Sequence, residues 1–412
     1  MGMSEKHRNM ARMTRNRIVI VGGGIAGLAA AFACSRVSQS VHVIERADRF
    51  GEVGAGIQIG PNVTRILLGW GLADTLSAVA AFPPRLAVRS AISARELAAR
   101  QLGESIRAQF GAPYATVHRA DLHQLLLGAV QAQGLASLAL GSELRQFVAS
   151  VQGVELHLAD GASLRADILL GADGLWSPVR QRLLDDGAPT PTGHLAYRAM
   201  VKQSDLPQAL RSEQVTVWLG PRMHVVQYPV RGGQWLNVVA IVEAQPDWLL
   251  AANATPGQLA NWNQLADVAQ LRSVLQGCCA PLRDLVDAID SWRLWVLCDR
   301  EPMGGPHEHA LGRVALIGDA AHPMRPYLAQ GAGMAIEDAA AMGAVLADAA
   351  MPADQALQVF AGQRWQRNRE VQQRARRNGQ IFHARGLLRL GRDAALALLG
   401  RRLLDLSWLY RH

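Results

Sequence analysis

Residues 17–34 read RIVIVGGGIAGLAAAFAC, and the fold class can be predicted from their pattern. Residues 18–21 are β-branched and apolar, which is typical of a fully buried parallel strand. Residues 25–34 are mostly small and apolar and predict a helix, and residues 40–44 (SVHVI) predict a second strand that leads into Glu45. The pattern therefore indicates a dinucleotide-binding strand–helix–strand unit with G-x-G-x-x-G at its first turn.

Each glycine of this motif has a physical role. Gly22 allows the tight turn, Gly24 lets the backbone approach a pyrophosphate, and Gly27 lets the helix pack close to the strand. The start of the helix presents free N–H groups and a partial positive charge to the phosphates. Glu45, 18 residues after Gly27, can accept hydrogen bonds from both hydroxyls of a ribose.

The composition bounds the class of protein. The chain has 412 residues, of which 50% are hydrophobic and 18% charged, as in a globular protein of two or three domains. The net charge of +8 suits an acidic small substrate. Many basic residues gather in the first 17 positions and after Arg364 and are not interleaved with aromatics, so we expect neither a nucleic-acid nor a membrane partner.

The cysteines and the N-terminal region bear on the compartment. The four cysteines form no C-x-x-C pair, so the sequence offers no metal cluster and no disulfide framework, and a cytoplasmic location is expected. A basic segment followed by the apolar residues 18–34 mimics a signal peptide, but the strand–turn–helix interpretation explains each glycine. No other apolar run reaches the length of about 18 residues needed to span a membrane.

Further elements are predicted from periodicity. Residues 148–159 and 163–170 are interpreted as a hairpin around Asp160-Gly161, and residues 213–219, 222–230 and 234–242 as an antiparallel meander. Helices are expected over residues 63–68, 120–132, 256–290 and 330–350 and in the tail after Pro352. Short buried strands are expected at residues 294–297 and 314–317.

Two further motifs place carboxylates at strand ends. Residues 167–180 read DILLGADGLWSPVR and residues 314–323 read VALIGDAAHP. In each, an aspartate (Asp173 or Asp319) follows a strand whose carboxyl end faces the ligand crevice of a doubly wound sheet. Asp-Gly is also a common turn pair, so a purely local role for Asp173 stays open.

Together the three motifs resemble the single-component FAD-dependent aromatic hydroxylases over nearly the whole chain, residues 17–410. The resemblance implies FAD as the cofactor and NADH or NADPH as co-substrate. It implies, with the glycine motif above, this set of cofactor-binding residues: Gly22, Gly24, Ile25, Ala26, Gly27, Glu45, Arg46, Gln58, Arg119, Asp173, Gly174, Asp319, Pro326, Gly331, Ala332, Gly333 and Met334. For Arg119 alone, a solvated charge at a helix start is the alternative.

The expected architecture is α/β, with a doubly wound, Rossmann-like FAD-binding domain interrupted by a β-sheet substrate domain and closed by a helical tail. Residues 1–16 are expected to be a flexible lead. Residues 17–75, 104–186 and 293–350 are assigned to the FAD-binding domain, residues 76–103 and 187–292 to the substrate domain, and residues 351–412 to the C-terminal helices. Monomer and homodimer both remain open.

A finer resemblance is to the branch that contains salicylate hydroxylase, 3-hydroxybenzoate 6-hydroxylase and 6-hydroxynicotinate 3-monooxygenase. The segments that carry it are residues 54–58 (GAGIQ), 196–198 (AYR), 218–221 (WLGP), 224–229 (HVVQYP), 329–332 (AQGA) and 336–338 (IED). Gln58 stands where the 6-hydroxynicotinate enzymes carry a histidine, and residues 325–327 (RPY) differ from the Leu-Gln-Tyr of the 3-hydroxybenzoate enzymes. The substrate within this branch therefore stays open.

His224 and Tyr228 are the candidate catalytic residues, because the resemblance implies that such a pair binds or deprotonates a phenol. At i and i+4 on a strand they share a face, roughly 13 Å apart, and can contact different parts of one molecule. Arg198 and Arg325 are candidates for anchoring a carboxylate, together with Tyr327 as a substrate contact. The alternatives are a satisfied sheet histidine, a half-buried tyrosine and a solvated Arg198.

The expected reaction follows from the cofactor: NAD(P)H reduces FAD, O2 forms a flavin C4a-hydroperoxide, and a small phenolic aromatic or heteroaromatic carboxylate is hydroxylated. A flavin oxidoreductase without oxygen insertion and a non-catalytic FAD-binding regulator are the alternatives. A flavin halogenase is disfavoured, because Trp-x-Trp-x-Ile-Pro is missing. The sequence selects neither NADH nor NADPH and does not say whether CO2 is lost.

Overall fold

The computed structural model describes residues 16–37, 39–51, 54–244 and 264–411. Its first sheet has six strands. Their order is β19 (Ala310–Leu311), β20 (Val314–Leu316), β12 (Ile168–Gly171), β1 (Arg17–Val21), β2 (Ser40–Ile44) and β8 (Ala136–Ala139). All neighbours except β19 and β20 pair in parallel. Since β2 and β8 lie on one side of β1 and β12 and β20 on the other, the topological switch point falls between β1 and β12.

Helices made of small residues pack on this sheet. α2 (Ile25–Arg36) lies against α6 (Arg119–Gln133) and α13 (Gly331–Val345), and α13 in turn lies against the long α14 (Ala353–Phe382). A Cβ built on Gly343 of α13 would lie 3.0 Å from the Cβ of Ala33 in α2, so the two helices approach closely because their contact residues are small. Their apolar residues form one core with β1, β2 and β12.

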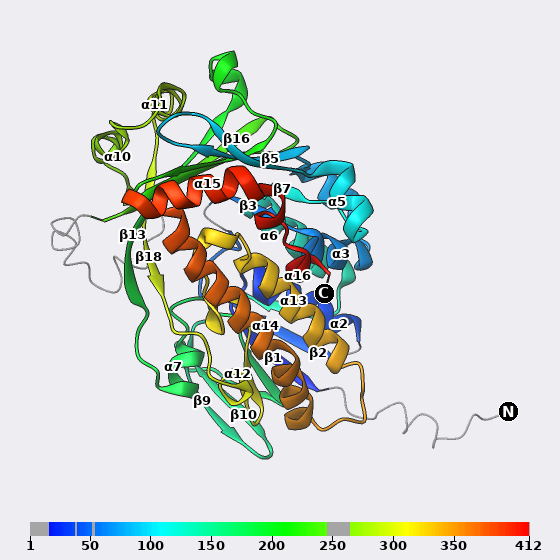
Figure 1. Cartoon of the computed structure of the whole chain (residues 1–412). Coiled ribbons are helices and arrows are strands. Elements are labelled where there is room, and N and C mark those ends of the chain that lie inside the picture. The colour runs from blue at the N-terminus through cyan, green and yellow to red at the C-terminus, as the bar shows by residue number, and fades with distance from the viewer. Residues whose placement is uncertain (1–15, 38, 52–53, 245–263, 412) are drawn as a thin grey trace.

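A second, eight-stranded sheet carries the other half of the fold. Its order is β17 (Gln264–Leu265), β18 (Arg293–Asp299), β13 (Thr190–Lys202), β16 (Trp235–Glu243), β15 (Met223–Val230), β14 (Val215–Gly220), β5 (Arg85–Ser90) and β6 (Glu96–Gln101). Figure 1 shows α10 (Val268–Leu275) and α11 (Ala280–Asp287) on one side of it and α14 and α15 (Gly386–Leu403) on the other.

Strand alternation sorts the residues of this sheet by face. Tyr197, Val225 and Val238 belong to the core that includes α10 and α11. Their neighbours along the strands, including Arg198 and His224, therefore point to the opposite face. We call this the inner face.

Smaller elements complete the chain. β3 (Gly56–Ile59), β7 (Ala115–His118) and β4 (Ala80–Ala81) form one three-stranded sheet, and β9 (Leu144–Ser150), β10 (Gly153–Leu158) and β11 (Ser163–Ala166) form another. The other helices are α3 (Pro61–Gly69), α4 (Ala73–Val79), α5 (Gly103–Phe110), α7 (Pro178–Leu184), α12 (Pro306–His309) and α16 (Ser407–Tyr410), with short 3-10 turns η1 (Gln203–Asp205), η2 (Gln208–Leu210), η3 (Gly318–Ala320) and η4 (Pro326–Leu328). Within the described ranges, none of the helices is both long and apolar enough to cross a bilayer.

The structure corrects three sequence-based expectations. The hairpin predicted around Asp160-Gly161 is present as β10 and β11. Its first run, however, is divided by a turn at residues 151–152 into β9 and β10, and its second run ends early because residues 168–171 form β12, which pairs with β1. Residues 293–299 were expected in the FAD-binding domain, but β18 pairs with β13 of the eight-stranded sheet. The helix predicted over residues 256–290 is a two-residue strand and two short helices from residue 264 on, and its earlier part lies outside the described residues.

Candidate active site

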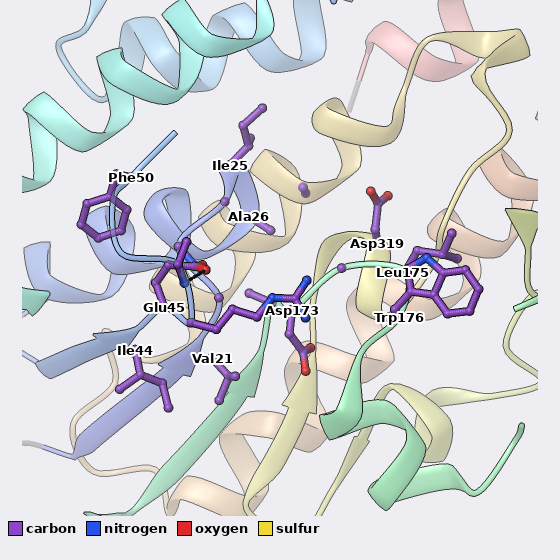
Figure 2. Close-up of a pocket in the computed structure, with 18 of the residues that line it drawn as sticks. Val21, Ile25, Ala26, Ile44, Glu45, Phe50, Asp173, Leu175, Trp176 and Asp319 are labelled. Atoms are coloured by element: carbon purple, nitrogen blue, oxygen red, sulfur yellow. Dashed lines mark hydrogen bonds between the residues drawn. The ribbon is translucent and has the colours of Figure 1, made fainter. Parts of the chain in front are cut away.

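A cleft opens at the carboxyl ends of the parallel strands, with a volume of about 360 Å³. Figure 2 shows side chains from separate segments around it, among them Glu45 after β2, Asp173 after β12 and Asp319 in η3. Of the predicted cofactor-binding residues, those that line the cleft are Gly22, Gly24, Ile25, Ala26, Glu45, Arg46, Arg119, Asp173, Gly174, Asp319, Gly331 and Ala332. The cleft thus brings together residues that are more than 300 positions apart in the chain.

The glycine turn has the geometry that the motif predicts. Gly22 has a φ of +107°, a region that L side chains rarely adopt. A Cβ on Gly27 would lie 1.9 Å from the carbonyl oxygen of Gly22, so only glycine lets α2 start this close to the turn. Gly24 caps α2 without a side-chain hydrogen bond from any described residue, which leaves the first N–H groups of the helix for an anion.

Glu45 braces this turn. One carboxylate oxygen, Oε2, accepts a hydrogen bond from the Gly23 N–H at 2.6 Å, and Oε1 accepts one from the Ala47 N–H at 2.9 Å. The carboxylate is thereby held in the lining of the cleft, beside the start of α2 (Figure 2). Glu45 has capacity for further hydrogen bonds, since a carboxylate offers about four lone pairs.

Asp173 has a local role in the structure. Its carboxylate accepts hydrogen bonds from the Ser177 hydroxyl and from the Val179 N–H, and so stabilises the start of α7. Burial raises the pKa of this carboxyl to about 6, against the opposing effect of those hydrogen bonds. Asp173 therefore has the local turn role that the sequence left open. Asp173 and Gly174 also line the cleft.

A buried ionic network holds the segment that carries Asp319. Asp338 of α13 accepts a hydrogen bond from the Gly318 N–H at 3.1 Å and is also bonded to His322. Its other oxygen accepts hydrogen bonds from Arg364 and Asn368 of α14, at 2.8 and 3.0 Å. These partners hold the pKa of Asp338 far below its usual value in spite of burial. The carboxylate thus fixes η3 against two helices.

Replacing Asp338 with asparagine should lower the free energy of unfolding by about 1.5–3 kcal/mol, because charge-assisted hydrogen bonds are weakened. A carboxyl whose pKa is lowered on folding stabilises the protein above its unfolded pKa of about 3.9, and this contribution is lost as pH falls. The difference between wild type and Asp338→Asn in denaturant titrations should therefore shrink below about pH 4. The exposed Asp290, changed to asparagine, should shift stability by less than about 0.5 kcal/mol.

Five of the predicted cofactor-binding residues lie outside the lining of the cleft in the described structure. Gly27 lies in the first turn of α2, packed against the Gly22 carbonyl group. Gln58 accepts a hydrogen bond from the Tyr114 hydroxyl. Pro326 starts η4, and Gly333 and Met334 lie in α13, where Met334 is fully buried in a core. Packing turns the side chain of Met334 into the interior and away from the cleft.

The cleft also contains residues that lie outside the sequence motifs. They follow the ends of strands β2 and β8: Arg49, Phe50, Ser142 and Glu143. Parallel strands bring the loops at their carboxyl ends to one edge. No short-range pattern distinguishes these loop residues, and the fold-level rule for strand ends is the one signal that could have found them.

Tyr228 and Arg198 meet on the inner face. Tyr228 is buried, and a Cβ on Gly56 of β3 would lie 2.6 Å from its ring, so the tyrosine packs directly against β3. Burial raises the pKa of Tyr228, while Arg198 nearby has the opposite effect. Burial, with a smaller effect of Arg119, lowers the pKa of Arg198 to about 10, and its guanidinium lies 5.2 Å from the ring centre of Trp295. Arg198 is a buried cation and not the solvated one of the alternative interpretation.

His224 belongs to a cluster of aromatic rings. Its Nδ1 is hydrogen-bonded to Nε2 of His383, 2.9 Å away, and its ring centre lies 5.3 Å from that of Tyr327. Tyr327 is hydrogen-bonded through its hydroxyl to Nδ1 of His194. Burial holds the pKa of His224 well below 6.5, and His383 and His194 add to the effect. His224 is therefore neutral at pH 7.

Arg325 is engaged in an ion pair. Its Nε donates to Asp299 at 2.7 Å, and the same carboxylate oxygen accepts from Arg376 at 2.8 Å. Asp299 itself is almost fully buried. The structure thus gives Arg325 a partner within the protein, which the sequence did not indicate.

The residues of the cleft fit an FAD nucleotide. The glycine turn leaves room for a pyrophosphate, the start of α2 offers N–H groups to it, and Glu45 and Asp319 offer carboxylates for hydroxyl groups. η4 joins the Asp319 segment to α13 and contacts His224 through Tyr327. Fold and site together define a doubly wound nucleotide-binding protein whose cleft adjoins a separate β-sheet face.

Comparisons with known proteins identify the family. Residues 15–375 match the FAD binding domain family, to which the chain therefore belongs. It is 35% identical over 397 residues to a 3-hydroxybenzoate 6-hydroxylase of Polaromonas naphthalenivorans (strain CJ2), covering 95% of both chains. It is 36% identical over 400 residues to a 3-amino-4-hydroxybenzoate 2-monooxygenase of Streptomyces platensis, covering 96% of both.

A solved salicylate hydroxylase substrate complex is 27% identical, with a TM-score of 0.80, and the match covers 96% of this chain and 95% of that one. These findings confirm the predicted family resemblance, the α/β fold class and FAD as the cofactor.

Proposed function

We propose that this chain is an FAD-dependent monooxygenase that uses NADH or NADPH and O2 to hydroxylate a small phenolic aromatic or heteroaromatic carboxylate. The observation that carries the proposal is that two segments next to the cofactor cleft, η4 and β3, contact the inner face. Tyr327 of η4 packs against His224, and Gly56 of β3 donates its N–H to Asn237 of β16 at 2.7 Å. The hydroxylases among the relatives support the substrate class.

The side chains on and beside the inner face have different proposed roles in the reaction. His224 accepts the phenolic proton, because a phenolate ring is a better nucleophile than a phenol. His383 is bonded to the other ring nitrogen of His224 and so sets its tautomer. Tyr228 and Arg198 orient the substrate, with Arg198 holding the carboxylate. FAD, when bound, supplies the hydride acceptance and the oxygen chemistry, and the buried face limits access of water.

The direct test is purification of the full chain and a visible spectrum, followed by NADH and NADPH oxidation with hydroxybenzoates and hydroxypyridine carboxylates. We expect a yellow protein whose oxidation of NAD(P)H depends on one of these acids, with one atom of 18O2 in the product. NAD(P)H oxidation without labelled product would favour an oxidoreductase that inserts no oxygen. Colourless folded protein that takes up no FAD would overturn the proposal.

Arg198→Gln should raise KM for the aromatic acid about tenfold to a hundredfold, because a charge-assisted hydrogen bond contributes about 1.5–3 kcal/mol. A phenol without a carboxylate should be much less affected. Arg325→Gln is the matched variant, and a small effect on KM is expected because its guanidinium is paired with Asp299. If Arg325→Gln alone raised KM while FAD content stayed normal, Arg325 would be the anchor, as the sequence suggests.

The compartment and the assembly are proposed on the same basis. Cys34, Cys278, Cys279 and Cys298 are all free thiols. Free thiols support the cytoplasm as the location, since reducing compartments keep thiols unpaired. We propose a monomer or a homodimer, which size-exclusion chromatography with light scattering distinguishes.

A further inference from the structure

We propose that His194, Glu243 and His383 form a binding site for a divalent transition-metal ion, best suited to zinc. The three residues come from β13, from the last position of β16 and from the end of α14. His194 and Glu243 are direct partners in the antiparallel pairing of β13 with β16. One ligand atom from each of the three residues lies within 4.8 Å of the others. Their separation in the sequence hides the set from any motif search.

The state of His383 points to a ligand. Its side chain is only 3% exposed, and its Nδ1 lies 4.0 Å from Oε1 of Glu243. This Nδ1 is buried and has no hydrogen-bond partner among the described residues. A buried nitrogen without a hydrogen-bond partner is rare in native proteins, and a bound metal ion would account for it.

The other ring nitrogens are arranged as in metal sites. Nε2 of His383 is hydrogen-bonded to His224, and Nδ1 of His194 to the Tyr327 hydroxyl. A metal-binding imidazole almost always bonds through its second nitrogen to another group, which fixes the ring. Each histidine therefore already has an orienting partner.

Charge and access decide which ion fits. Burial lowers the pKa of His194 to about 4 and that of His383 to about 3, so both rings carry a free lone pair at neutral pH. Two imidazoles and one carboxylate suit zinc, copper or nickel better than magnesium or calcium, and they leave a fourth position for water. The Glu243 side chain is 34% exposed, which gives the ion a route from solvent.

Neighbouring cations set a limit on affinity. Arg325 and Arg392 lie near enough to lower the pKa of the two histidines, and Arg222 approaches Glu243 to 3.7 Å. These guanidinium groups disfavour a dication. We therefore expect micromolar binding and a reversible site, not a structural one.

A second cluster of possible metal ligands is not suited to binding an ion. His309, His322 and Asp338 are equally close together and fully buried. Both oxygens of Asp338, however, already accept hydrogen bonds from Gly318, Arg364 and Asn368. Binding an ion there would break the network that holds η3. The nearest cation to Glu243 among the described residues is Arg222, at a long 3.7 Å, and the neutral ring of His383 lies 4.0 Å away.

An ion at the proposed site would bind side chains that are linked to His224. It would fix the rings of His383, which is bonded to His224, and of His194, which is bonded to Tyr327. Zinc should therefore inhibit hydroxylation reversibly. This readout rests on the proposed function, whereas binding of the ion does not.

The test uses the full chain loaded with FAD and freed of chelator. Zinc binding is measured by calorimetric titration and by metal analysis after gel filtration, and cobalt absorption reports the geometry. We expect one equivalent of zinc, with affinity reduced at least tenfold in Glu243→Gln and in His383→Gln. FAD content and melting temperature of Glu243→Gln should match the wild type, so that loss of binding is not loss of folding.

Two controls sharpen the result. Glu301→Gln changes an acid that is 86% exposed, and His307→Gln changes a histidine that is 75% exposed, and neither should affect zinc binding. Absence of stoichiometric binding to the wild type, or binding that survives Glu243→Gln unchanged, would overturn the proposal. A protein that binds zinc at this site but hydroxylates no aromatic acid would refute the proposed function alone.

Discussion

Gly27→Ala should abolish stable binding of FAD. The added Cβ would lie 1.9 Å from the Gly22 carbonyl oxygen, which is backbone and cannot rotate away. The start of α2 must therefore move away from the turn, at a cost of about 3 kcal/mol or more. This movement takes the N–H groups of the helix away from the place where the phosphates of FAD bind. A loss of that many kcal/mol in binding free energy lowers the affinity for FAD more than about a hundredfold. The measurement is flavin absorbance per protein, with a melting curve to establish folding.

Gly128→Ala is the matched control. Gly128 is an exposed glycine inside α6, and no described atom lies within 4 Å of a Cβ placed there. Alanine is favoured over glycine in a helix interior by up to about 1 kcal/mol, so this variant should be slightly stabilised and retain FAD. Normal FAD content in Gly27→Ala would refute the phosphate-binding role of the turn.

His224→Gln should lower kcat about 10²–10⁴-fold while leaving FAD content unchanged. The reason is loss of the group that accepts the phenolic proton. Because a phenol with a pKa near about 10 ionises by itself at higher pH, the deficit should narrow as pH rises towards 9. Burial keeps the pKa of His224 well below 6.5, so the wild-type rate should not fall between pH 8 and 6 through protonation of this histidine.

The control for this variant is His157→Gln. His157 lies on β10 and is hydrogen-bonded to Ser163 at 3.0 Å, in the small sheet away from the inner face. Its replacement should leave kcat and the pH profile intact. A His224→Gln deficit that is the same at every pH would indicate a structural role for the residue and not proton transfer.

The sequence predicted most of the elements that build the cleft. The strand–helix–strand unit appears as β1, α2 and β2, and the meander appears as β14, β15 and β16. These elements could be predicted because each is recorded in short-range patterns: apolar runs, period-two alternation and glycine at a turn. β18 was placed with the wrong sheet because an isolated apolar run does not indicate its pairing partner.

The substrate side of the site was predicted only as a set of residue types. His224 and Tyr228 share the inner face, as their spacing requires. The sequence did not indicate that His383 would lie against His224, since 159 residues separate the two. Arg325 was expected to face a carboxylate ligand, but the fold supplies Asp299 as a carboxylate within the protein.

The nucleotide-binding turn could be predicted from the amino-acid sequence alone, because steric limits at Gly22 and Gly27 and the helix start that follows are local properties of the backbone. The cofactor was implied by the resemblance of the three motifs to the FAD-dependent aromatic hydroxylases. Which charges are neutralised within the protein, and which face the site, could be seen only from the three-dimensional packing. Ion pairs such as Asp338 with Arg364, and ring contacts such as His224 with His383, depend on helices and strands distant in the chain being packed together. Electrostatic interactions depend on distance and burial in space, which the order of residues does not specify.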